Sequence, residues 1–321
     1  MSGARSEAPA RGAALHRAGR WLSRVLLQPE YPELAVEVRP GAVAAVRLSR
    51  EGRRLALGAA AVVDLPEGAL DVSLTRPNIV DAEGFRSTLK GALERAGALS
   101  GGPVSLVLPD PAVRLVLVDG AGLKVRRAEA EETIRFRLHK ALPFDVRASR
   151  IAWNGTRGGQ ALVAVALDEV VSNYEEVLES LGYEPGLVEV SSLALSTLDA
   201  GVAGDRLLVN WEDGYVSFLL HRGEQPLLVR TLPGEVGATS VSRQATSTLQ
   251  FYQDRLEGKG LDSVVLRAAG CPAEEAQPAL EAALETPVRL LEPWAALGTT
   301  ESAAPAQAVA AAAASALRRA A

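Results

Sequence analysis

The sequence has few of the residues that build metal centres and disulfide frameworks. It holds one cysteine, Cys271, and three widely separated histidines, His16, His139 and His221. A single cysteine excludes a disulfide framework and a cysteine-rich zinc site, and it is typical of a reducing compartment. The histidines do not have the spacing of metal ligands, and no nucleophile and orienting acid accompany them in a motif. We therefore expect neither a metal centre nor a catalytic triad.

Long apolar runs and an excess of positive charge are also missing. No apolar run reaches the roughly 18 residues of a membrane span, and the alanine-rich tract 308–314 is short and weakly hydrophobic. The net charge of -5 gives no basic field, so we do not expect nucleic acid as the main partner. The four tryptophans are dispersed and form no base-stacking pattern. The sequence predicts a soluble protein.

The clearest pattern is a run of strands and helices that begins near residue 206. Apolar strands are predicted at 207–211, 215–221 and 226–232. The first turn, Glu212-Asp213-Gly214, contains an Asp-Gly pair that suits the positive φ angles of a tight hairpin. Beyond Glu235, apolar residues recur at helical spacing, at Val241, Ala245, Leu249, Tyr252 and Leu256. A strand at 263–268 and a helix at 274–284 follow, so the order is β-β-β-α-β-α.

The first half of the chain repeats this order. Strands are predicted at 34–38, 43–48 and 55–64. Asp81 is a suitable N-cap for a helix that ends at Ala96, and a strand at 104–108 follows. With 321 residues, 48% of them hydrophobic, the chain can form two domains with full cores. Two such repeats indicate the α/β actin-like (ribonuclease-H-like) fold, in which two lobes face each other across a nucleotide cleft.

A segment of different character separates the repeats. Strands are predicted at 114–119, 151–154 and 161–167, and helices at 128–142 and 174–181. The first of these helices is charged and ends at Pro143-Phe144, and Gly182 ends the second. We interpret this segment as a small α/β subdomain inserted in the first lobe.

The patterns divide the chain into five parts. A basic tail with an amphipathic helix occupies 1–30, and the first actin-like lobe occupies 31–113. The inserted subdomain covers 114–184, a linker helix returning to the lobes covers 185–204, and the second lobe covers 205–321.

The N-terminal helix is predicted at 15–27. Trp21 and Leu22 lie on its apolar face, and arginines lie opposite. Such a helix either packs on the body or on a protein partner, or lies in a lipid interface. Because Arg20 and Arg24 interrupt the apolar residues, we do not expect a secretory signal.

Three segments resemble the PilM family of type IV pilus assembly proteins, relatives of actin and of FtsA. They are LVLPDPAVRLVLV at 106–118, TIRFRLHKALPFDV at 133–146 and LGYEPGLVEVSSLAL at 181–195. The block at 207–252 and the final alanine-rich helix also fit, so the resemblance spans about 34–319. It implies a cytoplasmic scaffold at the inner membrane face, within the pilus assembly platform. The cytoplasmic half of GspL is a similar family, but that family continues into a membrane span absent from this sequence.

The resemblance also implies a partner. In this family the short cytoplasmic N-terminal peptide of a PilN-like inner-membrane protein docks in a groove between the first lobe and the inserted subdomain. Leu142, Pro143 and Phe144 belong to that subdomain and are candidate contacts, although Pro-Phe could equally end the helix and plug the core. We expect membrane association through partners, and an oligomer is possible.

The family's first nucleotide loop, Asp-x-Gly-Ser-x-x-Val-Lys, corresponds to residues 37–44. Glu37 stands in place of the aspartate, and Arg39 replaces the glycine that lets phosphate approach the backbone. Pro40 replaces the serine, Gly41 follows it, and Ala44 replaces the lysine. Every polar element of the loop has therefore changed.

The second loop has changed as well. Asn210 stands in place of the metal-side aspartate, and Glu212 stands where the family has glycine. The other positions of the site, including what remains of the adenosine-side glycine pair, are Asp213, Gly214, Ala269 and Gly270.

A phosphate cradle needs flexible glycines, a supporting cation and an acidic Mg²⁺ ligand. We therefore predict a pseudo-ATPase with weak or absent nucleotide binding, in which Arg39 pairs with Glu212 across the cleft. The alternatives are an active ATPase that uses Mg-ATP in pilus or type II secretion assembly and, third, an enzyme of the sugar-kinase superfamily.

Overall fold

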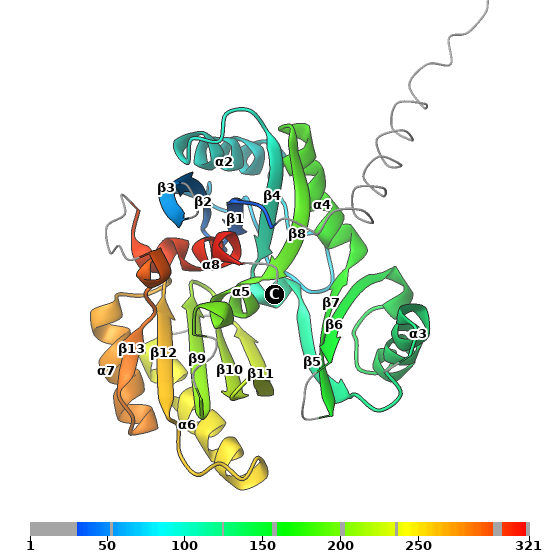
Figure 1. The fold of residues 1–321 in the computed structure, drawn as a ribbon, viewed down its shortest axis with the longest axis vertical. Helices are drawn as coiled ribbons and strands as arrows, with labels where there is room; N and C mark the ends of the chain where they lie inside the picture. Colours follow the sequence, from blue (N-terminus) through cyan, green and yellow to red (C-terminus); the bar gives the residue numbers. More distant parts are fainter. Residues whose placement is uncertain are drawn as a thin grey trace, which may run out of the picture.

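Two five-stranded sheets with the same strand order form the body of the protein (Figure 1). The computed structural model describes residues 31–51, 54–123, 125–155, 159–199, 203–234, 237–297 and 304–318. The first sheet has the order β3-β2-β1-β4-β8, and the second has the order β11-β10-β9-β12-β13. In both, an antiparallel three-stranded meander is extended by two parallel strands. The predicted internal repeat is confirmed.

The first sheet consists of β1 (Leu34–Val38), β2 (Ala42–Glu51), β3 (Arg54–Asp64), β4 (Gly102–Leu108) and β8 (Tyr183–Val190). Every residue of β1 is buried, because helices cover both faces of the sheet. Helix α2 (Ala82–Arg95) covers one face with Phe85, Leu89 and Leu93, and the Asp81 side chain caps it as predicted. Helix α8 (Ala306–Leu317) covers the other face.

The second sheet consists of β9 (Asp205–Glu212), β10 (Tyr215–Arg222), β11 (Gln225–Pro233), β12 (Ser263–Ala268) and β13 (Val288–Leu290). Helices α6 (Ala238–Arg255) and α7 (Ala273–Leu284) pack on one face of it. The predicted face of α6 is buried at Val241, Ala245 and Tyr252. Local periodicity was therefore sufficient to place these elements, except for β13, which was not predicted.

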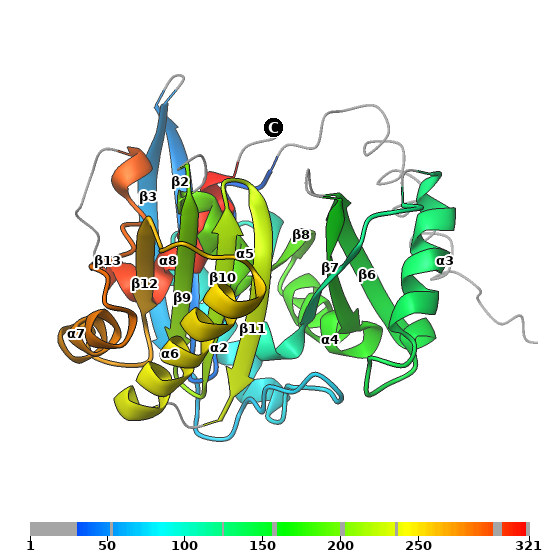
Figure 2. The same cartoon turned by 90° about the horizontal axis from the view of Figure 1, so that it is seen from below.

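The inserted subdomain is a small antiparallel sheet with one covering helix. Its strands, in the order β5-β7-β6, are β5 (Arg114–Asp119), β6 (Ser149–Gly155) and β7 (Gln160–Leu167). Helix α3 (Arg127–Leu138) packs on the sheet through Ile134 and Leu138. It lies on the outer side of the subdomain, away from both lobes, in Figures 1 and 2.

Several boundaries and domain assignments differ from those predicted. The predicted linker helix at 185–204 begins as strand β8, which runs to Val190, and its helical part is α5 (Ser191–Ser196) followed by a short turn of 3-10 helix, η3 (Thr197–Asp199). Helix α4 (Asp168–Ser180), assigned above to the subdomain, packs into the core of the first lobe. Helix α8, assigned to the second lobe, covers the first sheet with one face and packs against β9, β10 and β12 of the second with another. Helix α3 ends four residues earlier than predicted, and helix α4 begins six residues earlier than the predicted 174.

The two misassigned helices, α4 and α8, share one physical reason. Side-chain periodicity shows which face of an element is apolar, but it does not show which sheet that face covers. The remaining short 3-10 helices are η1 (Asp110–Ala112), η2 (Val146–Ala148) and η4 (Ala295–Leu297). None of the helices in the described ranges combines the length and the apolar character of a membrane span.

Candidate functional site between the lobes

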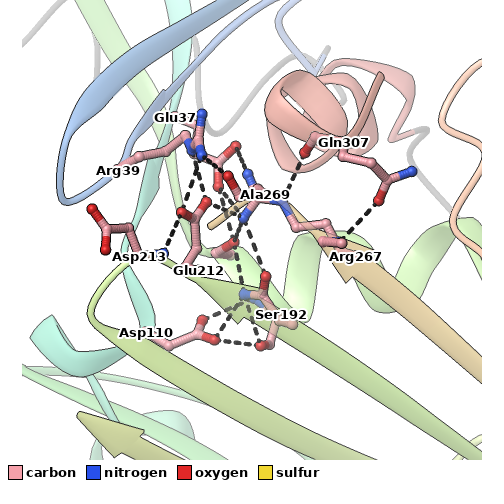
Figure 3. Close-up of polar contacts among 12 residues, drawn as sticks. Glu37, Arg39, Asp110, Ser192, Glu212, Asp213, Arg267, Ala269 and Gln307 are labelled. Atoms are coloured by element: carbon pink, nitrogen blue, oxygen red, sulfur yellow. Dashed lines mark hydrogen bonds and ion pairs between the residues drawn. The ribbon is translucent and has the colours of Figure 1, made fainter. Parts of the chain in front are cut away.

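The first hairpin of each lobe meets the other at the interface between the lobes (Figure 3). The turn between β1 and β2 carries Arg39, and the turn between β9 and β10 follows Glu212. Gly214 has φ +81, so the Asp-Gly pair gives this turn the positive φ that its sequence predicts. The repeat thus brings the two predicted nucleotide loops together.

Arg39 and Glu212 form a bidentate ion pair across this interface. Arg39 Nε donates to Glu212 Oε1 at 2.7 Å, and Nη2 donates to Oε2 at 3.1 Å. Nη2 also donates to the carbonyl oxygen of Ala269 at 2.9 Å. The side chains are only 9% and 1% exposed, so water screens the pair little. The predicted pairing of Arg39 with Glu212 is confirmed.

A second arginine, Arg267 of β12, lies deeper and was not predicted. Its side chain is fully buried and lies 3.0 Å from Glu37 Oε1 and 2.6 Å from Glu212 Oε1. Its Nε donates to the carbonyl oxygen of Gln307 in α8 at 2.9 Å. One guanidinium therefore joins an acid of each lobe to the C-terminal helix. The available signal was an arginine in the otherwise apolar strand SVVLRA, since buried charges need partners.

Polar side chains continue the network below the two arginines. Asp110 accepts hydrogen bonds from the backbone N–H and hydroxyl of Ser192 and from the Asn210 amide, the last at 3.1 Å. Asn210 Oδ1 accepts from Arg267 at 3.1 Å, and the Ser191 hydroxyl donates to Glu37 Oε1 at 3.0 Å. All six of these residues are buried to 1% exposure or less. Asn210, predicted on the metal side of the site, instead holds Arg267 and Asp110 in place.

The two glutamates have opposite pKa shifts. Burial raises the pKa of Glu37, and the charge of Arg267 offsets this only in part. Burial also acts to raise the pKa of Glu212, but Arg267 and Arg39 outweigh it and lower that pKa. Glu212 is therefore the better-paired carboxylate of the two.

The backbone around the second hairpin is closely packed. A Cβ at Gly270 would overlap the backbone nitrogen of Asp213 and the carbonyl carbon of Glu212. The N–H groups of Ala269 and Gly270 donate to the carbonyl oxygen of Trp211 at 3.0 and 3.2 Å. These two amides, which lie at the predicted adenosine side, are therefore used within the protein.

The remaining predicted residues lie at the rim or away from the network. Pro40 is partly exposed, and Gly41 lies beside the exposed Asp213. Ala44 is fully buried in the cluster that β1 and β2 form with Trp294 and α8. At the position where the family has lysine, this chain therefore makes a core contact.

In the subdomain, Leu142 and Phe144 are partly buried against Ile134 and Leu138, and Pro143 is exposed. This packing matches the core-plug interpretation, and a role in partner binding stays a prediction.

The predicted membrane or partner helix, with Trp21 and Leu22, lies outside the described residues.

Comparison with known proteins identifies the fold. No family model and no curated protein matches the chain. Among solved structures, the PilM-PilN type IV pilus biogenesis complex matches with 19% identity and a TM-score of 0.71, over 90% of this chain and 97% of that one. A Bacteroides thetaiotaomicron protein with an actin-like ATPase fold and unknown function matches with 10% identity and a TM-score of 0.51, over 82% and 91%. The chain has the actin-like ATPase fold.

The resemblance to PilM expected from the sequence is thus found in the structure, over nearly the full length of both chains. The cytoplasmic domain of EpsL, an inner-membrane component of the type II secretion system of Vibrio cholerae, matches with 14% identity and a TM-score of 0.48, over 74% of this chain and 83% of that one. Within this actin-like fold, the interlobe network occupies the meeting point of the two hairpin loops.

Proposed function

We propose that this protein is a non-catalytic, actin-like scaffold of a type IV pilus inner-membrane assembly platform, and that it binds a PilN-like protein. The supporting likeness is to a chain of a PilM-PilN complex, matched over 90% of the present chain. The observation that carries the non-catalytic part is Arg267, which is fully buried between Glu37 and Glu212 where the loops meet. Protein side chains therefore join the lobes, and no ligand is needed to do so.

The proposed partner contact is the short N-terminal peptide of the PilN-like protein, held between the first lobe and the subdomain. Strand β8 is the edge of the first sheet on this side, and an edge strand can pair with the backbone of an extended peptide. Figure 1 shows β8 and α4 beside the strands of the subdomain. Such a peptide gains main-chain hydrogen bonds from the edge strand and specificity from side chains on both bodies.

Site-directed cross-linking tests this contact. Cys271 is replaced by serine, and a cysteine is placed at the exposed Glu184 of β8 or, as control, at the exposed Asp254 of α6. A peptide copying the N-terminal segment of the PilN-like protein, with a thiol-reactive end, is expected to couple at position 184 and not at 254. Equal coupling at both positions would contradict the proposed groove. So would a peptide that binds the protein but does not couple at position 184.

The residues present do not fit Mg-ATP. The Glu212 carboxylate lies where the loop needs a glycine, and its pairs with Arg39 and Arg267 would have to break before either arginine could hold a phosphate. Breaking a buried ion pair costs about 3–5 kcal/mol, which corresponds to more than about a hundredfold in affinity. The Arg267 guanidinium and the close packing at Gly270 fill the same region. We therefore expect weak or absent nucleotide binding.

Calorimetric titration with Mg-ATP tests this expectation. We expect no saturable binding below the millimolar range, and Arg39→Gly should loosen the lobes without producing hydrolysis. A dissociation constant in the low micromolar range, with turnover lost on substitution of Glu37 or Asn210, would support the active-ATPase alternative and contradict the proposal.

Attachment to the membrane is proposed to occur at the cytoplasmic face of the inner membrane, through partners. The predicted helix at 15–27 would strengthen it, and each arginine near an anionic leaflet would add about 1 kcal/mol. Flotation with anionic liposomes should fall when Trp21→Glu and Leu22→Glu are combined. Equal flotation of both proteins would remove the helix from the proposal.

A further inference from the structure

The chain enters the folded body beside β8, the edge strand of the first sheet. The guanidinium of Arg318 lies over the ring of Tyr31, 5.9 Å from its centroid, and Arg318 pairs with Glu189 of β8. Pro32 is buried and lies against Gly186 of β8, 3.7 Å from where a Cβ on that glycine would be. The segment that precedes Tyr31 is therefore attached to the body next to this edge.

The attachment is short. Three residues, Gln28, Pro29 and Glu30, separate Tyr31 from the helix predicted at 15–27. Four steps along an extended chain span at most about 14 Å. The end of the predicted helix is therefore held within reach of β8, and a short tether gives an effective concentration on the order of millimolar. A weak contact is then enough to hold this segment on the body.

The edge strand offers a surface that such a segment can cover. From Glu184 to Val188, every residue of β8 is exposed or partly exposed, and Leu187 and Val188 add apolar surface. Edge strands can pair with foreign strands, and proteins commonly protect them by covering them with a helix or a loop. The apolar face of the predicted helix, with Trp21 and Leu22, suits this purpose.

The charges of the segment and of the edge region are complementary. The sequence from 15 to 27 has three arginines and no acid, whereas α4, which packs beside β8 (Figure 1), has five acids and no basic residue. Among the described residues, Arg150 pairs with two of these acids and Arg86 donates to the Ser180 hydroxyl. Five acids against these two arginines leave a net charge of -3. Glu169 and Glu176 are exposed and form no ion pair within the described part of the chain, so a basic occupant is favoured.

We propose that the segment at 15–27 docks along the edge of β8 on its own body, with Trp21 and Leu22 against the strand and its arginines toward α4. A helix is about 10 Å wide, so one that lies along β8 also reaches α4. The segment then occupies the groove proposed for the PilN-like peptide and competes with it. This competition rests on the proposed function, whereas the docking does not.

Cross-linking within the full-length chain tests the docking. In a Cys271→Ser background, Gly19→Cys is combined with Glu184→Cys of β8 or with Arg50→Cys of β2. Arg50 pairs with Glu33, so it lies near the chain entry but on the side of β1 away from β8. With a short bis-maleimide, we expect the internal cross-link to form at least about fivefold faster at position 184 than at position 50.

Two double variants separate docking from mere tethering. Trp21→Gln with Leu22→Gln keeps the tether but removes the apolar contact, so the two positions should cross-link within about twofold of each other. His16→Gln with Ser23→Gln, on the polar side of the predicted helix, is the matched control and should keep the preference for position 184. Equal cross-linking in the wild type, or a preference that survives Trp21→Gln with Leu22→Gln, would overturn the docking. So would cross-links that join two chains, which assign the edge to the segment of a second copy.

The competition has a separate readout. The thiol-reactive peptide described above should couple at position 184 about tenfold faster in Trp21→Gln with Leu22→Gln than in the parent protein, because a larger fraction of the grooves is then open. Equal coupling rates would contradict the competition. A peptide that couples at position 184 in neither protein contradicts the proposed function, and the internal cross-link still decides the docking by itself.

Discussion

The two lobes have the same strand order but contribute unequally to their common interface. Each provides one acid and one arginine: Glu37 and Arg39 from the first lobe, Glu212 and Arg267 from the second. Each arginine pairs with the acid of the opposite lobe, but Arg267 also lies 2.6 Å from Glu212 of its own lobe. The second lobe therefore satisfies much of its buried charge itself, whereas Glu37 depends on the second lobe.

The opposite pKa shifts of the two acids follow from this inequality. Glu212 faces two guanidiniums and keeps its charge readily, whereas burial dominates at Glu37. Opening the interface would remove the guanidinium of Arg267 from Glu37. A ligand can leave a cleft, but covalently attached side chains cannot, so we expect this interface to stay closed at all nucleotide concentrations.

The largest expected effect is that of Arg267→Met. The substitution leaves both glutamates buried without their shared cation, and removing one partner of a buried pair costs about 3–5 kcal/mol. Urea unfolding followed by circular dichroism measures the loss. Adding Glu37→Gln to the same protein should restore most of the stability, because Glu212 keeps its pair with Arg39. If Arg267→Met alone unfolded with a free energy within about 1 kcal/mol of wild type, the network would not be a stabilising unit.

The glycines of the two lobes provide the next comparison. Gly270→Ala places a Cβ against the backbone of Glu212 and Asp213, and we expect it to destabilise by about 3 kcal/mol. At Gly41 the nearest atom to a new Cβ is Asp213 Oδ2 at 3.9 Å, so Gly41→Ala should stay within about 0.5 kcal/mol of wild type. Thermal unfolding of the two variants checks this. Similar losses would mean that both loops are packed alike.

Arg39→Met should cost less than Arg267→Met, about 2 kcal/mol. Arg39 lies at the rim with 9% of its side chain exposed, and Glu212 keeps Arg267 when Arg39 is lost. Hydrogen exchange of the amides in the β9–β10 turn should quicken, because that turn loses its tie to the first lobe. A loss as large as that of Arg267→Met would contradict the unequal roles of the lobes.

The smallest expected effect is on the pH dependence of stability, to which Glu37 and Glu212 should contribute in opposite directions. The pKa of Glu37 is raised from its ordinary 4.5, so its contribution to stability is present at low pH and is lost as pH rises through the folded pKa. The pKa of Glu212 is lowered, so its contribution is present above 4.5 and is lost as pH falls.

Relative to wild type, Glu37→Gln should therefore gain stability, and Glu212→Gln should lose it, as pH rises from about 4 to 8. Urea midpoints measured at five pH values across this range will show the trends. Trends of the same sign would contradict the assignment of the two shifts.

The interlobe site was predictable only in part. The pairing of Arg39 with Glu212 followed from comparing the two loops, because both are hairpin turns of a recognisable repeat. Arg267 was missed, since its contact with Glu37 joins residues 230 positions apart and no local pattern links them. Strand β8 was missed for a related reason, because its place beside β4 depends on a parallel pairing that the intervening subdomain separates in sequence.

The sequence by itself determined the order of strands, turns and helices from β1 to β4 and from β9 to α7, because alternation, helical spacing, the Asp-Gly turn and the Asp81 cap act over a few residues. It also determined which residues stand at the two hairpin turns. Only the tertiary structure decided that α8 covers the first sheet, that α4 belongs to the first lobe, and that Arg267 joins both acids. These outcomes depend on which buried surfaces meet, and burial of distant segments is a property of the whole packed chain.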